Sequence, residues 1–313
     1  MRRVLYLLLF LSLIFTPLSY AKTPWTKKPP IGSQIDWSHP LSKGLIGCWL
    51  MNEGEGNIVG DIARRKGGTN NGAMWVAKKD GKTLNFNGTS AYVSTSSWFV
   101  GPPKGYTCSI WIKPVSASAL YVYTAQFRGL GSSQCYSQFL QASSRIYARI
   151  HQATDSPEIK IGRTAPPPTA GVWQNIIFTW DGTIADNSGI KIYVNGVRKD
   201  DTNEGTSITA PNAAVLPFII GAQFLSNGTR QSWVNGSMST VLIFKRALSP
   251  SEIQQLYIDP YCFIKPQTDW NCIQSAVAGG VIKTYNGLVW SNISKINGIV
   301  KSSIKTLNGV NAN

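Results

Sequence analysis

Short runs rich in β-branched and aromatic residues fill the chain from residue 44 to residue 257, and glycine, asparagine, aspartate or proline separates them. The runs are 45–51, 83–86, 91–95, 107–112, 145–150, 173–179, 190–194, 218–221 and 239–244. Many short strands with turn residues between them are typical of all-β sandwiches and barrels, and one such domain commonly spans about 200–250 residues. The sequence therefore predicts a single all-β domain over residues 44–260.

Alternation within the runs supports this interpretation. Alternate residues from Tyr106 to Ile112 are apolar, so they fall on one face of a strand. The residues between them, and Lys113, fall on the other face. The run 190–194 ends at Asn195-Gly196, a pair that tolerates positive φ and is typical of tight hairpins. The strands are therefore expected to pair antiparallel.

One short helix is predicted near the end of this domain. After the strand-like run 239–244 comes a basic turn, Lys245-Arg246, and then Ser249 stands three residues before Glu252. This is the capping-box spacing, in which the serine and the glutamate each satisfy a backbone N–H at the helix start. Pro250 fits the first helical position because its missing N–H would be unpaired there. The helix is expected over residues 250–256.

Several motifs follow one another in an order known from other proteins. They are GLIGCW at 44–49, NEGEG at 52–56, LNFNG at 84–88, SIWIKP at 109–114, WQNIIFTWDG at 173–182 and IYVNG at 192–196. Together with the closing strand and helix, this ordered set resembles the laminin-G-like jelly roll of the concanavalin A-like lectin/glucanase superfamily. The resemblance implies a two-sheet antiparallel jelly-roll sandwich.

The start of the chain has the features of an export signal. Arg2 and Arg3 precede an apolar run over residues 4–15, and small residues stand at Ser19 and Ala21. This pattern predicts a signal peptide over residues 1–21, cleaved after Ala21, and a secreted, periplasmic or extracellular protein with no membrane span. An uncleaved anchor is the alternative, but the run is short against the roughly 20 residues of a span.

Basic residues outnumber acidic ones, and removal of Arg2 and Arg3 lowers the net charge only from +15 to +13. The basic residues are scattered in pairs and form no run of five or more. A diffuse charge of this kind favours solubility rather than a specific nucleic-acid partner.

The domain is flanked by two segments of different composition. Residues 22–43 are rich in proline and lysine and are predicted to be an extended linker. Residues 261–313 hold two cysteines and then three copies of an Ile-x-x-x-Asn-Gly unit that begin 11 residues apart. Each copy predicts a strand and an Asn-Gly turn. This repeat tail resembles those of phage-associated and environmental bacterial proteins, and self-association through it is one of two functions left open.

Five cysteines would enter an oxidising compartment after export. Cys262 and Cys272 are close in sequence beyond the domain and are predicted to form a disulfide worth about 3 kcal/mol in the entropic model. Cys48 and Cys108 lie in strand-like runs and are expected to be buried. Cys135, after the Gly/Ser-rich residues 129–133, is then the expected unpaired thiol.

The acidic residues argue against an enzyme. A retaining glycosidase needs two carboxylates about 5–5.5 Å apart, and the pair Glu53 and Glu55 stands between glycines in a predicted loop. Asp200, Asp201 and Glu204 follow a hairpin turn beside basic residues and are expected to form a solvated loop. With only two histidines and no nucleophile elbow, a serine triad is excluded as well.

The other function left open is a non-catalytic binding module that recognises a carbohydrate or cell-surface ligand through loops at the sandwich rim. Of eleven tryptophans, Trp75, Trp98 and Trp233 lie near predicted loops and are the candidate ligand contacts. The others near strands are expected to pack in the core or on a sheet face.

No cofactor is required by any motif, but Asp61 and Asn71 offer oxygen ligands for a structural calcium ion. The alternative is that both cap turns in a glycine-rich loop. Capping is favoured because Ser239-Thr240 stands where members of the family often carry an acidic pair.

Overall fold

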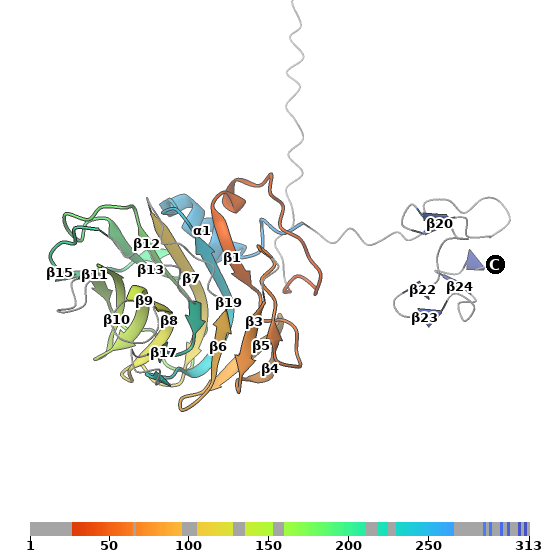
Figure 1. Cartoon of the computed structure of the whole chain (residues 1–313), viewed down its shortest axis with the longest axis horizontal. Coiled ribbons are helices and arrows are strands. Elements are labelled where there is room, and N and C mark those ends of the chain that lie inside the picture. Colours follow the sequence, from red (N-terminus) through yellow and green to blue (C-terminus); the bar gives the residue numbers. More distant parts are fainter. Residues whose placement is uncertain are drawn as a thin grey trace, which may run out of the picture.

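Two antiparallel β-sheets stack face to face in the computed structural model of the protein (Figure 1). The structure describes residues 27–64, 67–95, 105–127, 135–152, 160–210, 218–224 and 230–265, and six dipeptides between residues 284 and 311. The predicted signal peptide, Trp98 and Cys272 lie outside the described residues. The all-β, two-sheet prediction is confirmed.

The first sheet has eight strands in the order β14-β13-β12-β7-β19-β5-β4, with β1 also paired to β19. Its strands are β1 (Leu45–Trp49), β4 (Met74–Lys78), β5 (Gly81–Asn87), β7 (Tyr106–Pro114), β12 (Gln174–Trp180), β13 (Ile190–Val194), β14 (Val197–Arg198) and β19 (Asn235–Phe244). β19 changes partners along its length: Asn235–Met238 pair with β5, and Val241–Phe244 pair with β1. This long closing strand therefore holds the middle of the sheet together.

The second sheet has nine strands in the order β15-β11-β10-β9-β8-β16-β6-β3-β2. They are β2 (Ile58–Val59), β3 (Gly68–Asn71), β6 (Tyr92–Thr95), β8 (Tyr121–Phe127), β9 (Cys135–Ala142), β10 (Arg145–His151), β11 (Lys160–Ala165), β15 (Thr202–Gly205) and β16 (Phe218–Ile220). A small hairpin of β17 (Gln223–Phe224) and β18 (Arg230–Gln231) precedes β19. The hairpin lies at the end of the sandwich away from the helix (Figure 1).

The main core fills the space between the sheets. Tyr106, Cys108, Ile110 and Ile112 are all buried there, as their alternation along β7 predicts. Trp49 of the first sheet stacks on Phe218 of the second, with ring centroids 5.4 Å apart. Contacts of this kind bury large apolar surfaces from both layers, which is the main stabilising term of a sandwich.

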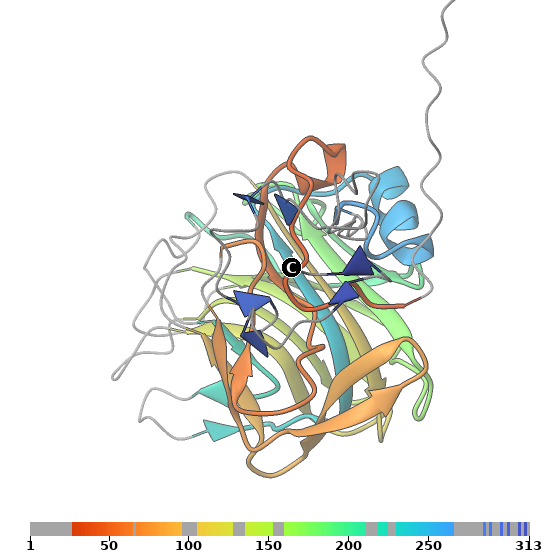
Figure 2. The ribbon, with the colours of Figure 1, turned by 90° about the vertical axis from the view of Figure 1, so that its right-hand side faces the viewer.

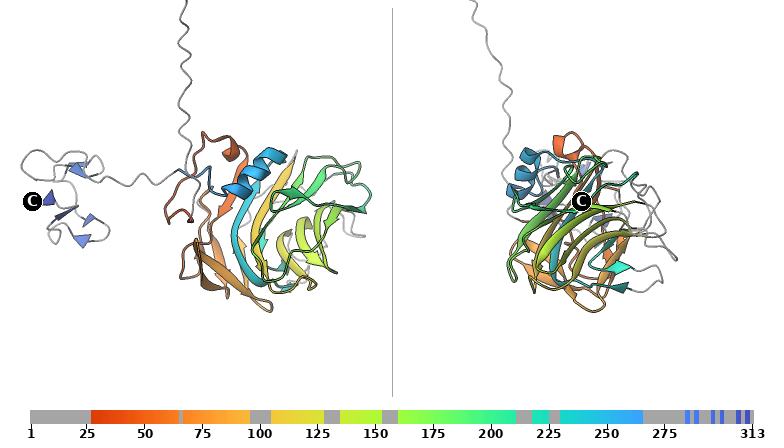
Figure 3. Two further views of the ribbon diagram at one scale, coloured as in Figure 1. Left: turned by 180° about the vertical axis from the view of Figure 1, so that it is seen from behind. Right: turned by 90° about the vertical axis from the view of Figure 1, so that its left-hand side faces the viewer.

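A second apolar cluster covers the outer face of the first sheet. It includes Cys48, Leu242 and Phe244 of the sheet, and Ile253 and Leu256 of the helix α1 (Pro250–Ile258). A 3-10 turn, η1 (Pro40–Ser42), lies beside α1 (Figure 2). Seen from behind, α1 lies over the sheet that contains β19 (Figure 3). The sheet is therefore buried on both faces in this region, and Cys48 and Cys108 are both buried as predicted.

The predicted capping box at the start of α1 is present. Ser249 accepts from the Glu252 backbone N–H, and Glu252 accepts from the Ser249 backbone N–H. Arg246 donates to both carboxylate oxygens of Glu252 at 2.8 and 2.6 Å, and these contacts lower the pKa of Glu252 to about 2. The helix runs two residues past its predicted end, to Ile258, and its buried residues Ile253 and Leu256 pack in the second cluster.

The packed unit extends beyond the predicted bounds of 44–260 at both ends. Ile35 and Ile264 form an antiparallel bridge, flanked by hydrogen bonds from Asp36 N to Phe263 O (2.8 Å) and from Lys265 N to Gln34 O (2.9 Å). Both isoleucines belong to the second cluster. The end of the predicted linker and the start of the predicted C-terminal segment therefore close the outer face of the sheet together. We name this pairing of residues 34–36 with 263–265 the terminal clasp.

Lys28, in the predicted linker, is also part of the packed unit. Its side chain is buried, and Nζ donates to the carbonyls of Leu50 (2.6 Å), Met51 (3.1 Å) and Lys82 (2.6 Å). Three acceptors match the three N–H groups of an ammonium, whereas a neutral amine has only two. Burial lowers the pKa of Lys28 to about 7, and the three carbonyls oppose that shift.

The prediction of a solvated loop fits Asp201, which is exposed between β14 and β15, but it is wrong for Asp200 and for Glu204, which lies on β15. The Asp200 side chain is fully buried and pairs with Arg163 and Arg198. Arg145 pairs with Asp201, and Arg149 makes a two-point contact with Glu204 at 2.7 and 2.6 Å. Arg198 is a near neighbour of Asp200 along the chain, but the other arginines come from β10 and β11, so a pattern read along the chain does not reveal those partners. The acids serve to hold the edge strands together.

In the C-terminal repeats the structure describes three two-residue strand pairs. They are β20 (Thr284–Tyr285) with β21 (Leu288–Val289), β22 (Lys295–Ile296) with β23 (Ile299–Val300), and β24 (Thr306–Leu307) with β25 (Val310–Asn311). Each pair flanks one Asn-Gly dipeptide of the sequence, and the dipeptides lie outside the described residues.

Candidate ligand-binding surface

Trp233 lies in the loop that joins β18 to β19. The loop is fixed by backbone hydrogen bonds from Val122 N to Ser232 O and from Val234 N to Gly221 O, both 2.8 Å long. These bonds tie it to β8 and to the residue that follows β16. The half-buried Trp233 side chain is therefore held by strands of the second sheet at one end of the sandwich.

Two further side chains complete an aromatic and basic group around Trp233. The Tyr92 ring, on β6, is 5.9 Å from the Trp233 ring, and the Arg230 guanidinium lies 4.4 Å from the centre of the Tyr92 ring. We name Tyr92, Arg230 and Trp233 the rim cluster. Aromatic faces beside a guanidinium can stack on a sugar or another ring and donate hydrogen bonds to polar groups. Trp233 was a candidate from the sequence; Tyr92 and Arg230 were not, because only the fold brings β6 and β18 together.

Trp75 is placed differently from Trp233. Its half-buried side chain, on β4, packs against the main core, and its Nε1 donates to the Gly56 carbonyl at 2.9 Å. This favours a packing role, and ligand contact through Trp75 stays a prediction. The same holds for Trp98, which lies outside the described residues.

Asp61 and Asn71 are both engaged with nearby groups of the chain. Asp61 Oδ1 accepts from the backbone N–H groups of Cys48 and Ala63, each at 2.9 Å. Asn71 Nδ2 donates to the Thr69 carbonyl and to Ser94 Oγ. The bond from Ala63 to Asp61 is the turn cap that the sequence favours, whereas Asn71 caps no backbone N–H through these two bonds.

The surroundings of Asp61 fit a calcium ion poorly. Burial raises the pKa of Asp61 and so disfavours the charged form, whereas calcium takes six to eight oxygen ligands that include ionised carboxylates. Across the described ranges, no three His, Cys, Asp or Glu side chains gather to hold a metal. Calcium binding stays a prediction without support from this geometry.

Glu53 also holds a loop in place. Its Oε1 accepts from the Gly60 backbone N–H at 2.8 Å, and Glu55 is exposed. A carboxylate that fixes a loop does not provide the paired acid and base of a glycosidase.

Cys262 is half-buried beside the second cluster. Its predicted partner, Cys272, lies outside the described residues, so the disulfide stays a prediction.

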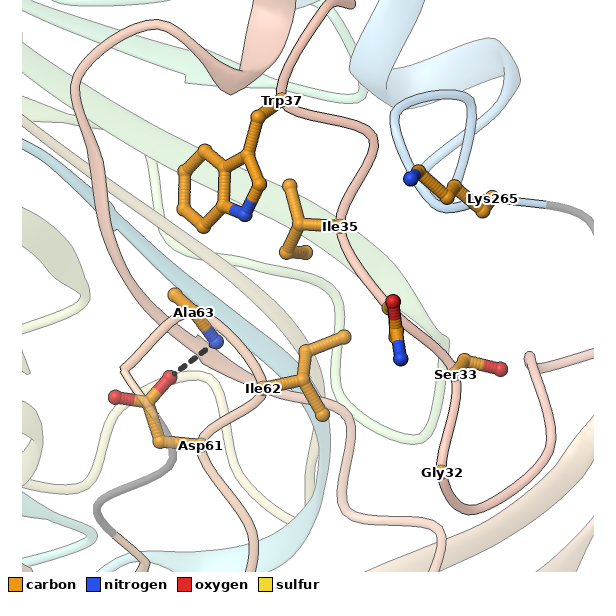
Figure 4. A pocket seen from close by; sticks show the side chains of 9 residues that line it. Gly32, Ser33, Ile35, Trp37, Asp61, Ile62, Ala63 and Lys265 are labelled. Carbon is orange, nitrogen blue, oxygen red and sulfur yellow. Dashed lines mark hydrogen bonds between the residues drawn. The ribbon is translucent and has the colours of Figure 1, made fainter.

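A pocket of about 410 Å³ lies beside the terminal clasp (Figure 4). Trp37 and Ile35 form one wall and face Ile62 and Ala63 across it, and Lys265 stands at its side. Trp37 is 58% exposed. Trp37 was not a candidate from the sequence, because it lies in the segment predicted to be a linker.

The two sheets, the closing strand β19 and the helix after it define a jelly-roll sandwich. Residues 87–254, more than half of the chain, match the family model described as the concanavalin A-like lectin/glucanases superfamily. The chain belongs to this superfamily, as the motif order indicates.

Solved structures agree on the fold. The binding domain of Paraclostridial mosquitocidal protein 1 matches 69% of the chain with a TM-score of 0.53 and 16% identity. The botulinum neurotoxin serotype D binding domain matches 70% with a TM-score of 0.51 and 9% identity. In each case the match covers 52% of the other protein. At these identities the likeness shows the shared fold alone.

Among curated proteins, the human adhesion G-protein coupled receptor D1 is 24% identical over 204 residues. The match covers 64% of this chain but only 21% of the receptor. Within the described part of this chain, no helix is long and apolar enough to cross a membrane.

Proposed function

We propose that the chain is a secreted, non-catalytic binding module that recognises a carbohydrate or cell-surface ligand through the rim cluster. The observation that carries this proposal is the 4.4 Å contact of Arg230 with Tyr92 beside the Trp233 ring. Tryptophan, tyrosine and arginine are the residues that most often dominate binding energies at protein surfaces. The loop that carries Trp233 is fixed by backbone hydrogen bonds, so little ordering of this loop is needed when a ligand binds.

The superfamily is described by both lectins and glucanases. The contacts of the acidic residues favour a lectin-like binding role over a catalytic one. Glu53 caps a loop, while Asp200, Asp201 and Glu204 are each paired with arginine. A carboxylate held in such contacts is poorly placed to donate a proton to a glycosidic oxygen.

Replacing Trp233 with alanine is expected to raise the dissociation constant about tenfold or more, because a surface tryptophan that anchors a ligand contributes about 2 kcal/mol or more. A glycan array with the mature protein would first identify a ligand, and titration of that ligand would then compare the variants. Ile58→Ala is the matched control, since Ile58 is an exposed apolar side chain on β2.

The same variant separates a binding role from a core role. A half-buried rim tryptophan should cost little stability, whereas loss of a core tryptophan costs about 3–5 kcal/mol. Unchanged ligand affinity in a folded Trp233→Ala protein would exclude the rim cluster as the binding surface.

A second function, self-association through the repeat tail, is favoured by the three strand pairs that flank its Asn-Gly dipeptides. Such short pairs bury little surface alone and gain stability when copies stack. Deletion of residues 274–313 is then expected to reduce the number of chains per particle, which light scattering after size-exclusion chromatography gives as the particle mass divided by the chain mass. The same number of chains per particle with and without the tail would rule this function out.

A further inference from the structure

The pocket beside the terminal clasp has no part in the rim cluster, since different segments build it. Its walls come from residues 32–37, residues 61–63 and Lys265, and none of these contacts the loop of Trp233 through a described hydrogen bond. Its volume of about 410 Å³ is within the range of small-ligand sites, about 300–1,000 Å³. The pocket thus has the size of a ligand site that the proposed function does not use.

The walls are held in place before any ligand arrives. The clasp bonds Asp36 N to Phe263 O and Lys265 N to Gln34 O fix one wall. The bond from Ala63 N to Asp61 Oδ1, drawn in Figure 4, fixes the other. A preformed site loses less entropy on binding than a site that must order its loops.

The lining combines an open aromatic face with polar groups. Trp37 is 58% exposed although it is one of the largest apolar side chains of the protein. Ile35 and Ile62 extend its apolar surface into the pocket. The polar residues Ser33 and Gln34 also line it, and the Ser33 hydroxyl, which donates to the Pro30 carbonyl at 2.7 Å, can still accept a hydrogen bond. An indole face with hydroxyl and amide groups at its edge suits a pyranose ring, whose C–H face is apolar and whose rim is polar.

Among the residues that line the pocket, Lys265 supplies the cation. Lys265 is exposed and forms no ion pair with any residue of the described ranges. The neighbouring Asp36 carboxylate accepts from the backbone N–H and the hydroxyl of Ser38, at 3.1 and 2.6 Å, and the pKa of Asp36 is lowered mainly by these bonds and to a smaller extent by the charge of Lys265. The other carboxyl of the lining, Asp61, is buried and accepts two backbone N–H groups. Lys265 is therefore available to a carboxylate from outside.

We propose that this pocket is a second ligand site and that it binds a sugar unit that carries a carboxylate, such as a uronic acid. The sugar ring stacks on Trp37 and its carboxylate pairs with the Lys265 ammonium. Ser33 and Gln34 contact the ring hydroxyls. This assignment does not depend on the rim cluster.

The test is a titration of the full mature chain with glucuronate and galacturonate oligosaccharides, each compared with its methyl ester. The ester removes the negative charge and adds one methyl group to each carboxylate. The acids are expected to bind at least about tenfold more tightly than the esters at low salt, and the difference should shrink as salt screens the charge.

Variants locate the site. Trp37→Ala should weaken acid and ester alike by about tenfold or more, whereas Lys265→Gln should weaken the acid alone and leave the ester unchanged. Trp233→Ala, in the rim cluster, should change neither, and thermal melts of each variant check that the fold is retained. Absence of uronate binding at millimolar ligand, equal binding of acid and ester, or wild-type affinity in Trp37→Ala would each overturn the proposal. Loss of uronate binding in Trp233→Ala would do so too, because it would place the sugar at the rim.

Discussion

Replacing Trp49 with alanine is expected to lower the free energy of unfolding by about 3–5 kcal/mol. Trp49 is fully buried and stacks on Phe218 of the opposite sheet at 5.4 Å with an angle of 11° between the rings. Its removal leaves a cavity between the two sheets and deletes a contact that joins them. Urea or guanidinium denaturation monitored by circular dichroism measures the change.

Trp37→Ala is the matched control for this experiment, because it deletes the same side chain from an exposed position. Its effect on stability should stay within about 0.5 kcal/mol. Trp49→Phe, which keeps an apolar ring in the core, should fall between the two. A loss below about 1 kcal/mol in Trp49→Ala would contradict the core packing described above.

Replacing Lys28 with methionine is expected to cost about 3 kcal/mol of stability below pH 7, where the amine is protonated, because three buried carbonyls lose a charged donor. Each hydrogen bond to a charged group contributes about 1.5–3 kcal/mol, and relief from burying the ammonium offsets part of the loss. Lys27→Met is the control, since Lys27 is exposed and carries the same charge. Equal stability of the two variants in denaturant titrations would show that the three carbonyls need no donor from Lys28.

The stability that depends on Lys28 should also vary with pH. The pKa of Lys28 is lowered by burial to about 7 from 10.5, and the nearby Asp80, Lys78 and Glu53 modify this shift. Between these two values the unfolded chain binds more protons than the folded chain, so stability rises with pH, by at most about 1.4 kcal/mol per unit. The difference in stability between the wild-type protein and Lys28→Met should therefore grow from pH 7 to pH 9. A constant difference would show that the pKa is not lowered.

Most strands and the helix that are marked by a pattern of neighbouring residues were predicted from the sequence. The run 190–194 coincides with β13 (Ile190–Val194), because its alternation and the Asn-Gly turn that follows mark both the strand and its end. The capped helix was predictable because Ser249 and Glu252 interact across a single turn. β9 and β11 were not predicted, since CYSQFLQA and KIGRTA mix polar residues and a glycine with few β-branched ones.

The sites depend on contacts between distant parts of the chain, and the sequence predicted them less well. Trp233 was a candidate because it lies near a predicted loop, but its partner Tyr92 is more than a hundred positions away in sequence. Lys28 gave no signal, because its partners are backbone carbonyls, which no residue type identifies. The segment around Trp37 is rich in proline and lysine, which predicted a linker. In the structure this segment pairs with residues 263–265 and forms a wall of the pocket.

The terminal clasp has a mechanical consequence. Residues 34–36 and 263–265 run antiparallel, so the chain leaves the clasp in one direction on both sides. Tension applied to the chain beyond the two paired segments would therefore open the clasp one hydrogen bond at a time before it loads the pairing of β1 with β19. Lys28 lies on the same path before the clasp, and its three carbonyl partners tie it directly to the sandwich. While these contacts hold, the sandwich is a closed loop that is spared the load, and only their opening transfers the force to its sheets.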